Sequence, residues 1–154
     1  ERYLEYYHKT TGFPYITIRP ANIYGPRGIN GVIPIFIRKF LAGETAVIEG
    51  DGEATRDFVF VHDIVRAALL AMEKPYVGPV NIGSGAEISM NDMFEIIKKC
   101  VGSEQERVHG EARKADVIRS ALDVSRAREH LDWSPEVDFE QGVRHTVEWF
   151  KNQI

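Results

Sequence analysis

The sequence has few of the features that mark secreted, membrane or nucleic-acid-binding proteins. Its single cysteine, Cys100, excludes an internal disulfide and is typical of a reducing compartment. The apolar runs are only a few residues long, too short for a transmembrane helix, and no secretory signal opens the chain. There is no basic excess either, because the formal net charge is -4, and this disfavours nucleic acid as a partner. We therefore expect a soluble, cytoplasmic protein that does not bind membranes.

Common catalytic and metal-binding motifs are missing as well. The five histidines are scattered without a His-x-x-x-His pair, and there is no second cysteine, so we predict no metal site. The hydrolase elbow Gly-x-Ser-x-Gly is absent. None of the six tyrosines has a lysine four residues on, so the Tyr-x-x-x-Lys pair of dehydrogenases is absent too.

What the chain does have is enough apolar sequence for one core. Of its 154 residues 44% are hydrophobic and 27% charged, which excludes a disordered chain. A chain of this size buries roughly 70% of its unfolded surface. A single domain is the expectation from size and composition.

Short apolar runs alternate with amphipathic segments along the chain. Strands are predicted over residues 15–19, 46–48, 58–61 and 80–82. Helices are predicted at the start of the chain up to Gly12 and over 33–41, 64–72, 90–101, 125–131 and 139–150. The proline- and glycine-rich residues 20–31 and the polar residues 103–115 are predicted to be loops. This order indicates an α/β domain.

Several residues have the chemistry of helix ends. Gly12 and Gly102 are suited to the left-handed closing position, and the first helix has no side-chain cap. Ser89 with Asp92 three residues on predicts a capping box. The other predicted N-caps are Asp63, Ser125 and Asp138.

Three glycines imitate a dinucleotide-binding fingerprint. Gly25, Gly28 and Gly31 form G-x-x-G-x-x-G, and Asp51 lies twenty residues beyond the last of them. The fingerprint requires its first glycine at the tight turn directly after a strand, whereas five residues separate Arg19 from Gly25. We interpret these glycines as loop residues.

Isolated arginines beside apolar runs are the remaining candidates for ligand binding. Arg56 precedes the apolar run 58–61, and Arg113 lies in a polar stretch. A planar, permanently charged guanidinium can grip phosphate oxygens through two hydrogen bonds. The alternative is an ion pair of Arg56 with Asp57 or Asp63, and the pattern alone favours this pairing because such pairs are common.

A set of sequence blocks along nearly the whole chain resembles one family. The blocks are RPANIYGPR at 19–27, GDG at 50–52, RDFVFVHD at 56–63, VNIGSG at 80–85, RKAD at 113–116, DVSRA at 123–127 and LDWSP at 131–135. In type, order and spacing they resemble the extended short-chain dehydrogenases that act as NAD-dependent nucleotide-sugar epimerases and dehydratases. The similarity is greatest to the UDP-glucose 4-epimerase branch. Two departures are Lys114-Ala115, where the family commonly has Pro-Gly, and Asp132, where it has Gly.

The resemblance implies a division of labour between two halves. In the family, an N-terminal Rossmann half holds NAD and carries the catalytic Tyr and Lys, and a C-terminal half binds the nucleotide sugar. This chain is similar to the C-terminal half, with residues 1–24 as the last helix and strand of the Rossmann half and 25–154 as the sugar-nucleotide part. We therefore expect the catalytic Tyr and Lys upstream of Glu1, a chain that is a piece of something longer, and no catalytic residue within it.

By the same resemblance, four residues would bind the diphosphate of the substrate. Asn22 and the backbone of Val32 would contact its oxygens. Arg56 and Arg113 would clamp them. Paired arginines would supply orientation as well as affinity for a group with about two negative charges.

The remaining implied contacts are to the nucleoside and to the cofactor. Asp116 would reach the ribose hydroxyls, and the backbone around Val47 and Glu49 would read the base. Pro20 and Ala21 would lie beside the nicotinamide of NAD, which the other half would hold for the most part.

The implied function is interconversion of UDP-glucose and UDP-galactose by the full-length enzyme, with this chain alone inactive. One alternative is a nucleotide-sugar 4,6-dehydratase or another epimerase of the family. A second is a non-catalytic nucleotide- or RNA-binding relative, since a fold alone does not decide function. The apolar runs 15–18 and 80–82 are expected to pair with strands of the other half, so that a homo-oligomer or a covering partner is predicted.

Overall fold

The computed structural model describes residues 1–112, 114 and 117–153 of the chain. Its helices are α1 (Arg2–Thr11), α2 (Val32–Leu41), α3 (Val61–Glu73), α4 (Met90–Val101), α5 (Ser125–Leu131) and α6 (Phe139–Lys151). Its strands are β1 (Ile16–Pro20), β2 (Asn22–Tyr24), β3 (Val47–Glu49), β4 (Thr55–Arg56), β5 (Phe58–Phe60), β6 (Gly78–Ile82), β7 (Ile88–Ser89) and β8 (Val108–Gly110). The predicted α/β class is confirmed.

The strands pair in twos, each with a strand distant in sequence. β1 pairs with β6, β2 with β5 and β3 with β8, all parallel, whereas β4 and β7 are antiparallel. Pro20 lies opposite Ile82, and two residues later Asn22 lies opposite Phe58. The chain therefore changes partners at Ala21, where residues 20–22, 57–58 and 82–85 meet.

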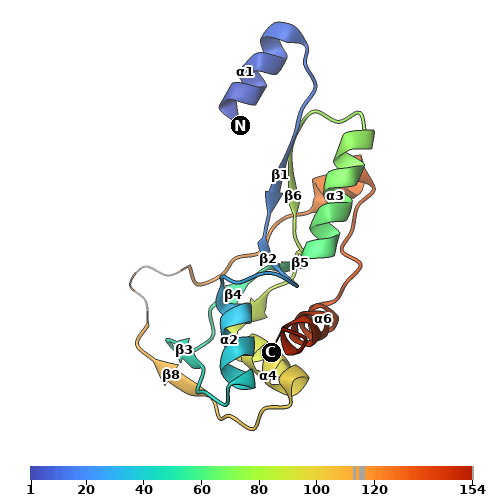
Figure 1. Cartoon of the computed structure of the whole chain (residues 1–154). Helices are drawn as coiled ribbons and strands as arrows, with labels where there is room; N and C mark the ends of the chain where they lie inside the picture. The colour runs from blue at the N-terminus through green and yellow to red at the C-terminus, as the bar shows by residue number, and fades with distance from the viewer. Residues whose placement is uncertain (113, 115–116, 154) are drawn as a thin grey trace.

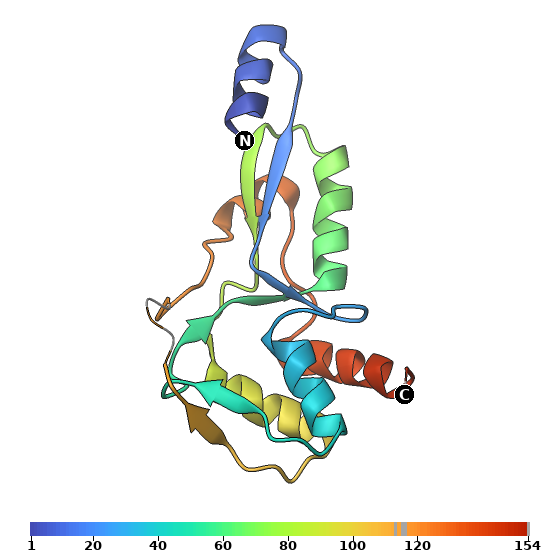
Figure 2. The ribbon, with the colours of Figure 1, turned by 60° about the vertical axis from the view of Figure 1, so that its left-hand side comes forward.

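The elements form two groups on either side of this junction (Figures 1 and 2). At one end α3 lies along the β1–β6 pair, and α1 projects beyond it with none of its residues buried. At the other end α4 packs against α2 and α6, with the β3–β8 pair at the margin. The arrangement places the strand junction between two separate hydrophobic clusters.

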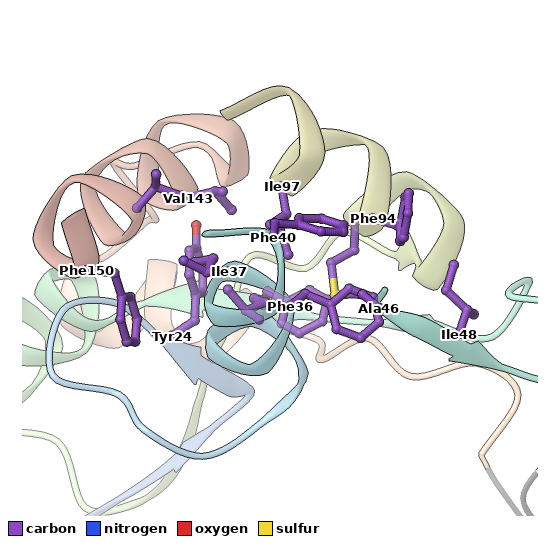
Figure 3. Packing of buried hydrophobic residues seen from close by; sticks show 14 of the residues in the cluster. Tyr24, Phe36, Ile37, Phe40, Ala46, Ile48, Phe94, Ile97, Val143 and Phe150 are labelled. Atoms are coloured by element: carbon purple, nitrogen blue, oxygen red, sulfur yellow. The ribbon is translucent and has the colours of Figure 1, made fainter. Parts of the chain in front are cut away.

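The larger cluster joins α2, α4 and α6 (Figure 3). Phe40 and Phe94 meet edge to face with their ring centroids 5.1 Å apart, and Phe36 makes the same kind of contact with Phe94 at 6.0 Å. Such aromatic pairs add to the free energy of burying the rings. Because the apolar residues of each helix recur at helical spacing, all three helices turn one face to this cluster.

The smaller cluster lies under α3 and α5, around Trp133. Trp133 is 1% exposed, and its indole Nε1 donates to the carbonyl of Asp63 at 3.0 Å. The carboxylate of Asp63 accepts from the backbone N–H of Glu136 at 3.0 Å and of Val137 at 3.2 Å. Asp63 thus ties the start of α3 to the segment that follows α5.

Four of the predicted helix ends are confirmed. Ser89 and Asp138 cap α4 and α6, each accepting the N–H of the residue three positions later at 2.9 Å. Gly12 and Gly102 close α1 and α4 with φ of 75° and 79°. Local sequence is sufficient for these ends because each cap contact spans only three or four residues.

The predictions for two other N-caps are wrong. α3 begins at Val61 rather than after Asp63, so Asp63 falls in its first turn and binds a distant segment instead. α5 begins at Ser125 itself, whose N–H donates to the carboxylate of Asp123 at 2.9 Å. Asp63 is thus recruited by backbone donors outside α3, and Ser125 is a donor to Asp123 rather than a cap.

The predicted loops are also wrong in part. Residues 20–31 contain β2, and residues 103–115 contain β8. The predicted strand over 58–61 ends at Phe60 because Val61 already belongs to α3. Strands this short exist because a distant partner completes their hydrogen bonds, which no local pattern shows.

The two runs expected to pair with strands outside the chain pair with each other, as β1 and β6. Pairing with any further strand stays a prediction. Next to them α1 exposes three tyrosines, with Tyr3 90%, Tyr6 67% and Tyr7 55% exposed. Among the described residues, none of the helices has the length and apolar character needed to span a bilayer.

The contact between α6 and β2 leaves no room for a side chain at Gly142. A Cβ at this position would lie 2.8 Å from Cζ of Tyr24 and 3.0 Å from Cδ2 of Phe60, and Tyr24 is held by a hydrogen bond to the carbonyl of Phe139 at 3.2 Å. We expect Gly142→Ala to destabilise the chain by about 2 kcal/mol in urea unfolding, in spite of the better helix propensity of alanine. Exposed Gln141→Ala on the same helix is the control, and an unchanged Gly142→Ala midpoint would contradict the packing.

Candidate functional site

Asn22 and Arg56, two of the predicted diphosphate contacts, meet on either side of Asp57. Asn22 donates its backbone N–H and its side-chain Nδ2 to the carbonyl of Asp57, at 3.1 and 2.8 Å. Arg56 is the residue before Asp57 and the last residue of β4. Asn22 and Arg56 are 34 positions apart in sequence. The bonds of Asn22 to Asp57 place it next to the residue that follows Arg56.

The guanidinium of Arg56 is bonded to backbone carbonyls. Nη1 donates to the carbonyl of Val117 at 2.5 Å and to that of Thr55 at 2.8 Å. The backbone N–H of Thr55 donates to the carbonyl of Ile118 at 2.9 Å. β4 therefore holds residues 117–118 alongside it, and the Arg56 guanidinium lies where these two segments meet.

The carboxylate next to Arg56 belongs to a different network. Asp57 is 1% exposed, and its Oδ1 accepts from the N–H and the hydroxyl of Ser84 at 2.8 and 2.6 Å. Its Oδ2 accepts from the N–H groups of Gly85 and Leu122, both at 3.1 Å. With the carboxylate of Asp63 bound to residues 136 and 137, the expected ion pair of Arg56 with Asp57 or Asp63 is wrong. Four donors offset the cost of burying this charge.

The first turn of α2 has the features of an anion-binding helix end. Its N-cap is Gly31, with φ of 98°, so no side chain bonds to the first N–H groups, and the first turn has no acidic residue. Val32 is the first residue of the helix, as its predicted contact with the diphosphate requires. Both ribbon views show α2 starting near the β2–β5 pair and running away from it (Figures 1 and 2). The partial positive charge of a helix start attracts anions.

The register of β3 bears on the predicted recognition of the base. Gly50 donates its N–H to the carbonyl of Gly110 on β8 at 3.1 Å. The N–H and C=O groups of successive residues alternate in direction along a strand. The backbone groups of Ile48 therefore also face β8, and the backbone groups of Val47 and Glu49 face the opposite edge. The side chain of Ile48 is buried in the larger cluster. β3 thus turns the backbone of the two predicted residues away from its partner strand.

Pro20 and Ala21, the predicted neighbours of the nicotinamide, lie at the carboxyl end of β1. Ala21 donates its N–H to the carbonyl of Ile82 at 2.8 Å. A Cβ on Gly83 would be 3.1 Å from that of Ala21 and 2.5 Å from Oδ2 of Asp57. Position 83 therefore accepts only glycine, because the Asp57 carboxylate and Ala21 pack directly against its backbone.

Arg113 and Asp116, the other predicted substrate contacts, lie outside the described residues. The segment directly after them is held by an ion pair as well as by β4. Arg119 donates Nε to the two oxygens of Glu87 at 2.9 and 3.2 Å, and the hydroxyl of Thr55 donates to Oε2 of Glu87 at 3.1 Å. The bond from Arg119 holds the pKa of Glu87 below its usual value.

Two shallow cavities lie away from these residues, around Arg19. Their volumes are about 180 and 250 Å³, and both are lined by Arg19 and Pro79. The Arg19 guanidinium donates Nε to the carboxylate of Glu1 at 2.8 Å. Neither of these two cavities is lined by a predicted site residue.

Sequence reasoning missed the part played by Asp57, Ser84 and Leu122. The sequence suggests Asp57 only as an ion-pair partner of Arg56 and suggests no role for Ser84, although an aspartate directly before an apolar run was an available sign. Nothing in the local sequence points to Leu122, which contributes only its backbone N–H.

The chain is similar to known proteins over nearly its whole length. Residues 1–83 match the model of the NAD dependent epimerase/dehydratase family. A putative UDP-glucose 4-epimerase of Methanocaldococcus jannaschii is 41% identical over 99% of the chain, which covers 50% of that protein. The chain therefore spans about half the length of the curated relatives it matches.

Solved structures match over the same extent. A UDP-glucose 4-epimerase of Thermotoga maritima with UDP-glucose superposes with a TM-score of 0.94, at 44% identity over 99% of this chain and 50% of that one. A UDP-N-acetylglucosamine 4-epimerase of Methanobrevibacter ruminantium gives 0.95, at 37% identity over 100% and 51%.

The contacts of Glu87 predict that it holds residues 117–119 against β4. In Glu87→Gln we expect the Thr55 amide, which donates to Ile118, to exchange its hydrogen faster by at most roughly fivefold, because exposed ion pairs are weak. Since the pKa of Glu87 is lowered, the pair stabilises the fold above the ordinary carboxyl pKa and loses this effect as the pH falls through the lowered value. The difference from the parent chain should then vanish in acid.

The control for this measurement is Glu95→Gln, since the carboxylate of Glu95 has only a distant ion-pair partner, Arg107 at 3.8 Å. Equal exchange of the Thr55 amide in the Glu87 variant and the parent at neutral pH would contradict the role of the ion pair.

Proposed function

Because the chain belongs to the NAD dependent epimerase/dehydratase family, we propose that it binds the nucleotide part of a UDP-sugar and serves as the substrate-binding part, residues 25–154, of a UDP-sugar 4-epimerase. The observation that carries this proposal is the meeting of Asn22 and Arg56 at Asp57. The similarity to two 4-epimerases that are named for UDP-sugars supports the choice of uridine nucleotide and reaction.

The diphosphate is the part of the substrate that this surface suits best. The Arg56 guanidinium is permanently charged, and two carbonyls already fix its position. Asn22 keeps Oδ1 and its second amide hydrogen for a ligand, since Nδ2 makes one bond to Asp57. The N–H groups at the start of α2 would add uncharged donors, and Arg113 a second guanidinium.

The nucleoside would extend from the diphosphate toward β3. Backbone groups of Val47 and Glu49, on the edge directed away from β8, would pair with the base. Asp116 would accept from the ribose hydroxyls. With the nucleotide held at both ends, the sugar is the only part of the substrate left to turn, as exchange of configuration at C4 requires.

NAD would approach the carboxyl end of β1, beside Pro20 and Ala21, in keeping with where parallel strands usually receive ligands. When bound, NAD would supply the acceptor and donor of a hydride. The role of this chain's residues is to orient the sugar toward that position and to exclude other poses.

The proposal predicts that the chain binds UDP in titration calorimetry and that Arg56→Ala weakens binding roughly tenfold or more, because a charged hydrogen-bond donor is lost. Arg113→Ala should act in the same direction. Arg144→Ala is the matched control, since Arg144 pairs with Glu140 on the remote helix α6. Salt-dependent RNA binding without any response to UDP would reject the proposal and favour a scaffold.

A second prediction concerns turnover. The chain contains no Tyr-x-x-x-Lys pair, so we expect no conversion of UDP-galactose by the purified 154-residue chain with added NAD. Coupled detection of UDP-glucose would measure it, with an active UDP-glucose 4-epimerase as the positive control. Turnover above the buffer blank would show that this chain carries its own acid–base group.

A further inference from the structure

We propose that Asp57 is a positioning residue for the diphosphate: it holds Asn22 and the segment bonded to Arg56 in the geometry that binds the ligand. The inference rests on the proposed function. It adds a residue that the resemblance did not assign and that reaches the ligand only through other side chains.

The main chain of Asp57 acts on Asn22. Its carbonyl accepts two hydrogen bonds from Asn22, at 3.1 Å from the backbone and 2.8 Å from Nδ2. The second bond sets the plane of the exposed Asn22 amide and so the direction of its remaining polar atoms. A shift of the Asp57 backbone would rotate the amide away from the ligand.

The side chain of Asp57 acts on two further segments. Oδ1 accepts hydrogen bonds from the N–H and the hydroxyl of Ser84, and Oδ2 accepts from the N–H groups of Gly85 and Leu122. Leu122 lies five residues after Val117, and the carbonyl of Val117 accepts a hydrogen bond from the Arg56 guanidinium. The carboxylate therefore fixes the far end of the segment against which Arg56 is placed.

The carboxylate has no freedom to find other partners. Its Oδ2 lies 2.5 Å from where a Cβ of Gly83 would be, so it is pressed against the backbone that follows β6. An asparagine of the same shape would have to replace one oxygen by an amide nitrogen. That nitrogen would face two N–H or O–H donors and could not accept a hydrogen bond from either of them. The turn at Ser84 and the backbone at Leu122 could then not both keep their positions.

Asp57→Asn separates positioning from simple electrostatics because the two predict opposite signs. Removal of a negative charge one residue from Arg56 would by itself strengthen binding of an anion. Loss of positioning weakens it. The sign of the change in UDP affinity is therefore a readout that a general charge effect cannot imitate.

Asp63 is the matched control for loss of stability. It is a second buried carboxylate, 2% exposed, that accepts two backbone N–H groups, but these belong to residues 136 and 137, and its Oδ1 also pairs with Arg66 at 3.3 Å. Asp63→Asn removes the same charge from a set of contacts that includes neither Asn22 nor Arg56. Both variants should lower the midpoint of thermal unfolding.

The experiment is titration calorimetry of UDP with the parent chain, Asp57→Asn and Asp63→Asn at a temperature where all three are folded by circular dichroism. We expect Asp57→Asn to weaken UDP binding roughly tenfold and Asp63→Asn to leave it within about twofold. Equal or tighter binding by Asp57→Asn would overturn the inference. An equal loss in both variants would overturn it too, because the effect would then be one of stability.

Ser84→Ala keeps the inference testable where Asp57→Asn does not fold. It removes the 2.6 Å bond from the Ser84 hydroxyl to the carboxylate, together with the contacts of that hydroxyl with Ala86, and leaves the three N–H groups on the carboxylate. We expect roughly threefold weaker UDP binding, and unchanged binding would count against positioning. A parent chain that does not bind UDP would instead reject the proposed function, so the two failures are distinguishable.

Discussion

The buried carboxylate of Asp57 is the interaction on which the arrangement of the candidate site depends. It accepts four hydrogen bonds from two segments, while the carbonyl of the same residue accepts two from Asn22. Each of these donors lowers the cost of burying the charge, and loss of one raises that cost. The strands that meet here are short and have few hydrogen bonds between them. The hydrogen bonds to Asp57 therefore hold the neighbouring segments together, as the strands of a wide sheet do in larger folds.

The two hydrophobic clusters explain why such a junction is needed. One is built by α2, α4 and α6, the other by α3, α5 and the β1–β6 pair, and the chain crosses between them at residues 20–24 and 57–60. The apolar contacts of each cluster hold its own helices together. The polar contacts of Asp57 then place the segments at the border, where Asn22 is exposed and Arg56 half-buried. The proposed binding groups thus lie at the border between two packed clusters.

Departures from the family pattern have local physical consequences that the structure makes visible. Asp132 stands where the family has glycine, and it adopts φ of 54°, a left-handed conformation that glycine adopts with less strain. The turn at this residue brings Trp133 back under α3, where its indole bonds to the carbonyl of Asp63. Asp132 therefore closes α5 in a conformation that is typical of glycine.

The amino-acid sequence by itself determined the α/β class, the caps of α4 and α6, the glycine ends of α1 and α4, and the family, because these depend on contacts within a few residues or on a pattern of motifs. Arg56 and Asn22 could also be named from the motifs. Tertiary structure alone decided that β2 and β8 exist, that Asp63 bonds to residues 136 and 137, and that Asp57 joins Ser84 to Leu122. These partners lie tens of residues apart, and only the folded backbone brings an N–H group to a particular carboxylate.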